Sequence, residues 1–185
     1  MPLQKTTKGE LVRTCIRVFR RQGYYRTTMA DLATATGLTK GAFYHHFASK
    51  EAIMQSVLAE TSAYFAEKVF RVAYAADLPA AQRLDALAAA ALKAFSYDGR
   101  GGCIFANTVL ETAHVEDTFL DQIKAFFAAW REALQTIFES RHDAPTAAQL
   151  AVRVMADVEG SLLLMQLYKD PAYLTDALAR GKALL

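Results

Sequence analysis

The spacing of apolar residues is the feature that most restricts the fold of this chain. Apolar side chains recur at helical spacing along nearly the whole sequence, and no segment sustains the alternation of apolar and polar residues that marks a half-buried strand. One such stripe, with the i, i+3, i+4, i+7 spacing of a helix face, consists of Val12, Cys15, Ile16 and Phe19. The sequence therefore predicts an all-α fold.

Capping signals divide the chain into about nine helices. Thr28 and Asp31 have the spacing of a capping box, Gly37 has the position of a C-cap, and Thr146 and Asp170 mark the last two starts. The expected helices run over about 8–22, 28–36, 39–46, 50–74, 79–95, 103–114, 117–141, 146–169 and 171–184.

Charge is distributed unevenly along the chain. The net charge of the 185 residues is +2, but residues 1–50 carry nine Lys and Arg residues against Glu10 and Asp31, a net charge of +7. The remaining 135 residues therefore have a net charge of −5. A basic head on an acidic body is typical of a head that meets a polyanion such as nucleic acid, although the same charges also fit a role in solubility alone.

The window 27–53 predicts a helix-turn-helix. Two helices of about eight residues are joined by a turn at Gly37, and another helix can pack across them. In this arrangement the second helix enters a major groove of DNA. Phe43 and Phe47 lie four residues apart on that helix and are expected to point into the core, which leaves outside Thr39, Lys40, Gly41, Tyr44, His45 and His46.

These outer residues have the chemistry of DNA contacts. Lys40, Tyr44 and His45 can donate to phosphate oxygens or base edges, and Gly41 lets the backbone approach a duplex closely. Lys50, at an amide-rich helix start, adds a phosphate site. Outside a helix-turn-helix, the same side chains would equally fit a solvated helix face.

The segment GYYRTTMADLATATGLTKGAFYHHFASKEAIM resembles the DNA-binding signature of the TetR family of bacterial transcriptional repressors, and the resemblance covers about residues 8–56. The features that carry it are Thr27-Thr28, the turn at Gly37, Tyr44, Phe47 and Ser49-Lys50-Glu51. GGCIFANTVLE, at 101–111, is also similar to the start of the sixth helix in one broad subset of that family.

The resemblance implies roles for individual residues. Phosphates would be contacted by Thr28, Tyr44 and Lys50. The residues expected to face bases or nearby DNA backbone are Thr39, Lys40, Gly41 and His45. It also implies a DNA-binding domain at 1–50, a ligand-binding and dimerisation domain at 51–185, and a ligand-responsive repressor.

The last two helices are expected to offer apolar surface to a partner as well as a core. Their apolar residues are Leu150, Val154, Val158, Leu162, Met165, Tyr173, Leu174, Leu178 and Leu184. The resemblance implies that the partner is a second copy of the chain. A homodimer places two recognition helices about 34–36 Å apart and so predicts a palindromic double-stranded operator.

The C-terminal body also has the residue types of a small-molecule site, namely apolar walls with a few polar groups. Its expected lining comprises Tyr64, Phe65, Leu92, Phe95, Phe105, Phe126, Phe127, Trp130, Met155 and Leu163, with the polar residues Cys103, Asn107, Thr108, Glu111, Glu159 and Gln166. Glu111 and Glu159 stand out because a carboxylate midway along an apolar helix is costly to bury without a partner. The aromatic residues also fit an ordinary core, and either glutamate also fits an exposed face.

The two cysteines are expected to be free thiols with different roles. They lie far apart in unlike contexts, so a disulfide framework is not expected. Burial of Cys15 in an apolar stripe would make it inert. Cys103 begins a helix close to Arg100, and both the helix dipole and the cation favour a thiolate. Cys103 is therefore an alternative switch, a sensor of oxidants or electrophiles, although it also fits a small residue packed at a helix start.

Catalytic machinery is not expected. Glu111 and His114 have the Glu-x-x-His spacing of carboxylate-bridged metal enzymes in helical bundles, but the sequence lacks a second such pair. It also lacks a Gly-rich phosphate loop, a Cys-x-x-Cys pair and a nucleophile with a recognisable base. We therefore expect no enzymatic activity and no cofactor. The absence of a 20-residue apolar run and of a leader-like start predicts a cytoplasmic protein without a membrane segment.

Overall fold

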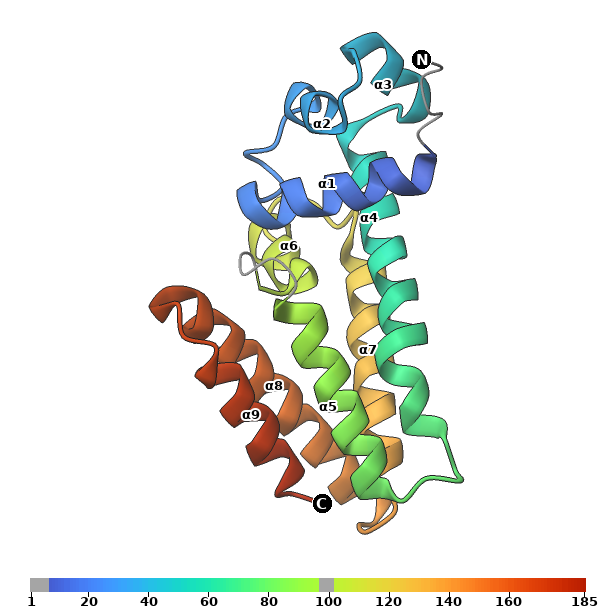
Figure 1. The fold of residues 1–185 in the computed structure, drawn as a ribbon, viewed down its shortest axis with the longest axis vertical. Coiled ribbons are helices and arrows are strands. Elements are labelled where there is room, and N and C mark those ends of the chain that lie inside the picture. Colours follow the sequence, from blue (N-terminus) through green and yellow to red (C-terminus); the bar gives the residue numbers. More distant parts are fainter. Residues whose placement is uncertain (1–6, 97–101) are drawn as a thin grey trace. The chain divides into compact units, whose positions relative to one another are not determined.

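The computed structural model describes residues 7–96 and 102–185, over which it contains nine α-helices and no strand. The helices are α1 Lys8–Gln22, α2 Met29–Thr36, α3 Lys40–His46, α4 Lys50–Phe65, α5 Ala80–Ser96, α6 Ile104–Thr112, α7 Leu120–Phe138, α8 Ala144–Tyr168 and α9 Ala172–Lys182 (Figure 1). The predicted all-α class is confirmed. Across these two described segments, no helix combines the length and the apolar character that crossing a bilayer requires.

The chain forms two compact units. Unit 1 comprises Met1–Thr61 and Ile104–Ile123, and unit 2 comprises Ser62–Cys103 and Lys124–Leu185. Beyond the residues expected for the head at 1–50, unit 1 also contains α4 up to Thr61, α6 and the beginning of α7.

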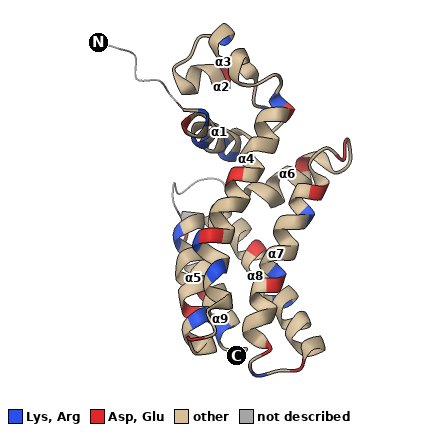
Figure 2. Cartoon of the chain, turned by 90° about the vertical axis from the view of Figure 1, so that its right-hand side faces the viewer, with Lys and Arg blue, Asp and Glu red and all other residues tan. Residues whose placement is uncertain are grey.

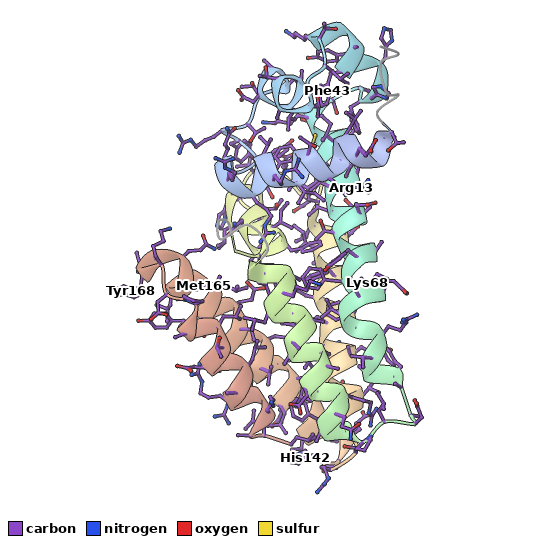
Figure 3. The ribbon with its side chains drawn as sticks, viewed as in Figure 1. Arg13, Phe43, Lys68, His142, Met165 and Tyr168 are labelled. Atoms are coloured by element: carbon purple, nitrogen blue, oxygen red, sulfur yellow. The ribbon has the colours of Figure 1, made fainter. Side chains whose placement is uncertain are left out.

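The core of unit 1 forms beneath α3. Phe43 is fully buried and Phe47 nearly so, and their ring centroids lie 5.3 Å apart. Cys15 and Phe19 from α1 and Leu32 from α2 are buried in the same unit. Figure 3 shows Phe43 in the interior, where the helices of the head meet. The pair of rings predicted to face inward from α3 does so.

The last two helices, α8 and the shorter α9, pack together in unit 2. Figure 1 shows α8 and α9 packed side by side, with α5 against α9. The Arg180 guanidinium on α9 donates to both oxygens of Asp157 on α8, at 2.7 and 2.9 Å, and Lys182 pairs with Asp85 of α5. These exposed ion pairs lie at the edges of a buried apolar seam that includes Val158.

Several predicted helix ends differ from the structure, among them both ends of α7, which was expected over 117–141. The helix expected over 50–74 leaves α-helical geometry after Phe65 and continues as a π-helical turn, Ala66–Phe70, and a 3₁₀ turn, Arg71–Tyr74. The eighth helix also starts earlier than expected, because α8 is capped by Asp143, whose carboxylate accepts from the Thr146 amide at 3.0 Å. Thr146 therefore lies inside the first turn instead of capping it.

Replacement of Phe43 by Ala is expected to lower the free energy of unfolding by about 3–5 kcal/mol, because it leaves a cavity under α3. The control is Tyr44→Ala at the next position, where the side chain is 44% exposed, and it should change the free energy by less than about 0.5 kcal/mol. Chemical denaturation followed by circular dichroism measures both. Equal destabilisation by the two variants would contradict the inward orientation of Phe43.

Candidate nucleic-acid interface and effector site

Local hydrogen bonds fix the turn between α2 and α3. The Thr28 hydroxyl accepts from the Asp31 amide at 3.1 Å, and the Asp31 carboxylate accepts from the Thr28 amide at 2.8 Å. The Thr28 hydroxyl also donates to the Asp31 carboxylate at 2.7 Å, and this bond, followed by the one from the Thr28 amide, holds the pKa of Asp31 below its ordinary value. Gly37 ends α2 with a left-handed φ of 72°, which glycine adopts without strain. Thr39 then caps α3 by accepting from the Ala42 amide at 3.3 Å.

Burial of the two phenylalanines fixes the outward face of α3. Six of the seven predicted DNA-contact residues are exposed, namely Thr28, Thr39, Lys40, Gly41, Tyr44 and His45. At Gly41, open space lies where a side chain would begin, so a duplex backbone can approach. We call the exposed residues of 39–46 the α3 face; it presents hydroxyl, ammonium and imidazole groups, and α3 contains no acidic residue.

Lys50, the seventh predicted contact, is half-buried and already has a structural partner. Its ammonium donates to the Tyr24 carbonyl oxygen at 3.0 Å and lies 4.3 Å from the centroid of the Tyr24 ring. An ammonium has three donors, so the position still offers hydrogen bonds to a phosphate. Its role in DNA binding stays a prediction.

Basic side chains accompany the α3 face in unit 1. Figure 2 shows several Lys and Arg residues along α1, and Arg17 and Arg21 among them are exposed, as is Arg26 in the following loop. Arg13 instead pairs with Glu60 of α4 at 3.6 Å. The positive charge predicted from the sequence is therefore largely accessible to a polyanion.

The loop between α1 and α2 is held by residues that the sequence analysis did not assign to the head. The Glu111 carboxylate of α6 accepts from the Tyr25 amide at 3.1 Å, and the Tyr25 hydroxyl donates to Glu116 at 3.3 Å. The Tyr24 ring packs edge-on against Phe119 at 5.0 Å. We call Tyr24, Tyr25 and their partners the tyrosine latch.

Ionisation within the tyrosine latch follows from its contacts. Burial, followed by the nearby charge of Glu51, raises the pKa of Tyr24, whose hydroxyl donates to that carboxylate. Burial and Glu116 raise the pKa of Tyr25 in the same direction. Both phenols therefore remain neutral donors near pH 7. In the sequence, the signal for the tyrosine latch is the pair Tyr24-Tyr25, which directly follows Gly23 at the end of α1.

The structure places Glu111 in the tyrosine latch of unit 1 and not among the aromatic residues of unit 2, where the predicted effector site lies. Its Glu-x-x-His partner His114 is exposed. Over the described part of the chain, no group of three His, Cys, Asp or Glu side chains has the arrangement of a metal site.

Aromatic rings form a continuous cluster in unit 2. In an α-helix, residues five apart lie about 140° apart around the axis, but the wider π-helical turn after Phe65 brings it and Phe70 to the same side, with centroids 5.7 Å apart. Phe126 contacts both, and Phe95 and Trp130 extend the cluster, with neighbouring centroids 5.3–6.3 Å apart. The five rings are at least 93% buried.

The remaining predicted effector residues lie at the margin of this cluster or outside it. Phe127 stacks on Trp130, with centroids 6.2 Å apart and ring planes 22° apart, and Met155 is half-buried. Tyr64 and Leu163 are 45% and 66% exposed, so they do not belong to the buried cluster. Asn107 lies on α6 in unit 1.

Cys103 and Glu159 form a polar pair in unit 2. The Cys103 thiol donates to the Glu159 carboxylate, which lowers the pKa of that carboxyl, but burial raises it by more. Cys103 is 3% exposed and directly precedes α6. Arg100, the cation invoked for a thiolate at this position, lies outside the described residues.

The exposed face of α8 is more apolar than a solvated helix face. Five large apolar residues on it are between 37% and 66% exposed, namely Val152, Leu163, Leu164, Leu167 and Tyr168. Figure 3 shows Tyr168 at the end of α8. Leu162, which the sequence analysis grouped with the partner-facing residues, is only 1% exposed and belongs to the core. The sequence signal for this exposed face, which the sequence analysis did not use, is the pair of small residues Ala156 and Gly160, which lie on the same side of α8 as Leu163.

Two family models match the chain. The model described as bacterial regulatory proteins, tetR family, matches residues 11–57, and the model described as transcriptional regulator LmrA/YxaF-like, C-terminal domain, matches residues 79–180. The second match alone spans more than half of the chain.

Individual proteins agree with these matches. The HTH-type transcriptional repressor DhaR of Mycobacterium sp. (strain GP1) is 28% identical over 169 residues, which cover 88% of this chain and 84% of DhaR. The uncharacterized HTH-type transcriptional regulator YerO of Bacillus subtilis (strain 168) is 45% identical over 49 residues, or 26% of this chain and 17% of YerO. A TetR transcriptional regulator from Legionella pneumophila has a similar structure, with a TM-score of 0.88, 22% identity and full coverage of both chains.

Proposed function

Because the chain belongs to the TetR family of bacterial regulatory proteins, we propose that it is a homodimeric repressor that binds a palindromic operator and releases it when a mainly apolar effector binds. The family consists of DNA-binding transcriptional regulators and not of enzymes, so the metal-enzyme alternative is set aside. We place the protein in the cytoplasm, where its DNA lies.

The α3 face is the observation that carries the DNA-binding role. Its residues are held outward by the buried pair Phe43 and Phe47, and the basic residues of α1 lie in the same unit. Tyr44 and Lys50 are the residues we assign to phosphates, which position the protein. Lys40 is the residue we assign to base edges, which specify the sequence.

The apolar face of α8 supports the homodimer. A single recognition helix reads too few base pairs for selectivity, so two heads are needed. Leu163, Leu164 and Leu167 form a patch of the kind that a symmetric interface covers. We therefore assign α8, together with α9, to the contact between two copies.

The aromatic cluster of unit 2 supports the effector role. Apolar walls with few polar groups are typical of small-molecule sites, and π-helical turns such as Ala66–Phe70 occur frequently at functional sites. An effector that binds the DNA-releasing form 100-fold more tightly than the DNA-bound form supplies about 2.7 kcal/mol, which is enough to empty a marginal operator.

Operator binding tests the assignment of the α3 face. With an operator selected from random duplexes by the wild-type protein, Tyr44→Phe should weaken binding by roughly tenfold and keep the preferred sequence, because one phosphate contact is lost. Lys40→Ala should change the preferred sequence. Fluorescence anisotropy at fixed salt measures the affinity, and repeated selection measures the preference.

The control for operator binding is Lys93→Ala, which removes an exposed lysine from α5 in unit 2 and should leave both quantities unchanged. If the Tyr44 and Lys40 variants behaved like this control, the recognition helix would be misplaced.

Sedimentation velocity tests the α8 interface. Leu163→Glu and Leu167→Glu should turn a dimer into folded monomers, because each places two buried charges in the contact. Leu110→Glu is the control, since Leu110 on α6 is 76% exposed and outside α8. Leu162→Glu should instead unfold the chain. A wild-type monomer at micromolar concentration would rule out the two-headed repressor.

Thiol chemistry distinguishes the proposed noncovalent switch from the alternative sensor at Cys103. Burial raises the pKa of Cys15 to about 11, so at pH 8 this thiol is protonated, and its reactivity should rise only as the pH approaches 11. The variant Cys103→Ser should therefore be unreactive with Ellman's reagent at pH 8 until it is unfolded.

Because Cys103 is buried and donates to Glu159, N-ethylmaleimide should leave operator binding by the wild-type protein intact. Release of DNA by the treated wild type, but not by treated Cys103→Ser, would establish the sensor instead.

A further inference from the structure

Glu159 lies midway along α8 in unit 2 and has an unpaired carboxylate oxygen. Its Oε1 atom is inaccessible to solvent and has no hydrogen-bond partner among the described residues. The hydrogen bond from the Cys103 thiol to this carboxylate leaves Oε1 without a partner. Among the ion pairs of residues 7–96 and 102–185, none includes Glu159.

An unpaired buried oxygen of this kind is costly. Leaving a buried acceptor unsatisfied costs about 1–3 kcal/mol, and more when the group is charged. A thiol is a weak donor and does not replace the hydration of a carboxylate. Burial accordingly raises the pKa of Glu159 despite the contact with Cys103. The Oε1 atom therefore lacks a donor among the described residues.

Glu159 belongs to a small group of polar side chains in unit 2. Gln166 is seven residues further along α8, on the same side of the helix. Its amide nitrogen occupies the space that a side chain at Gly102 would need, and Gly102 has a positive φ of 49°. The segment 102–103 therefore packs against the two polar side chains of α8, beside the Cys103 thiol.

We propose that Glu159 receives a protonated amine of the effector, which is then a mainly apolar molecule with one cationic nitrogen. The inference rests on the proposed effector-controlled function. An ammonium N–H that donates to Oε1 would satisfy the unpaired oxygen, and its charge would favour the ionised carboxylate. A neutral hydroxyl would supply the donor without the charge, and an anion would be repelled. The aromatic cluster around Trp130 is the apolar surface that we assign to the rest of the molecule.

Three probes with one skeleton test this ligand class: phenylbutylamine, phenylbutanol and phenylbutyrate. Trp130 is the single tryptophan of the chain and is 4% exposed, so quenching of its fluorescence reports binding in unit 2 of the full-length protein. We expect the amine to bind at least about tenfold more tightly than the alcohol, as a charge-assisted hydrogen bond supplies, and the acid to bind least.

The variant Glu159→Gln keeps the size of the side chain and removes its charge. It should abolish the preference for the amine while changing the affinity for the alcohol by less than about twofold, since the alcohol gains nothing from the charge. Glu132→Gln, an exposed position on α7, is the matched control and should keep the preference.

Three outcomes would overturn the inference: equal binding of amine and alcohol by the wild type, a preference that survives Glu159→Gln, or no response to any probe at its solubility limit. Operator binding is measured on the same preparations. If the wild type binds no operator, the proposed function fails; if it binds operator but shows no amine preference, the inference about Glu159 fails alone.

Discussion

Burial of Phe43 and Phe47 is the constraint on which the α3 face, to which we assign the reading of DNA, depends. A helix of seven residues has little stability of its own, so α3 forms because two rings of one face are buried and a threonine caps its start. Once those rings are inside, the 100° spacing of a helix turns Lys40, Gly41 and Tyr44 outward. The residues that stabilise α3 and the residues that we assign to DNA thus lie on opposite faces of the same two helical turns. For this reason Phe43 is buried and the adjacent Tyr44 is exposed.

The tyrosine latch connects this surface to the rest of unit 1. Tyr24 receives the Lys50 ammonium through its carbonyl and donates its hydroxyl to Glu51, both at the start of α4, while Tyr25 is held by Glu111 of α6. The loop that leads into the helix-turn-helix therefore has partners on two different helices. A displacement of α6 relative to α4 within this unit must break or lengthen one of these bonds. Such a displacement would move the loop itself, because the Tyr25 amide and the Tyr24 carbonyl of its backbone are the groups that form these hydrogen bonds.

Much of the fold followed from local signals. The capping box at Thr28, the glycine at 37 and the 3.6-residue period predicted the fold class and most helix ends, because these signals act over only a few residues.

The predictions that failed depended on packing between distant residues. Leu162 and Leu163 are adjacent and equally apolar, yet one is core and the other surface, and a helix rotation of 100° decides which. Glu111 and Glu159 have similar sequence contexts, but the partner of Glu111 lies 86 residues away, and the partner of Glu159 is the residue directly before α6. The π-helical turn at 66–70 has no local signature at all.

The difference between the two glutamates bears on how an effector could act. Glu111 has a strong backbone donor, so it is a fixed element of the head, and a ligand would gain little by competing for it. Glu159 has a weak thiol donor and an oxygen without a partner, so a ligand that supplies a donor gains free energy there which the unliganded protein cannot. A ligand shifts an equilibrium only through such a difference between two states.

The position of Cys103 in the chain connects Glu159 to α6. Cys103 donates a hydrogen bond to Glu159 and is followed directly by α6, whose Glu111 accepts from the loop that leads to α2. An amine held at Oε1, as proposed above, shares the carboxylate of Glu159 with Cys103, the residue directly before α6, and α6 also carries the Glu111 carboxylate that accepts from the Tyr25 amide in the loop between α1 and α2.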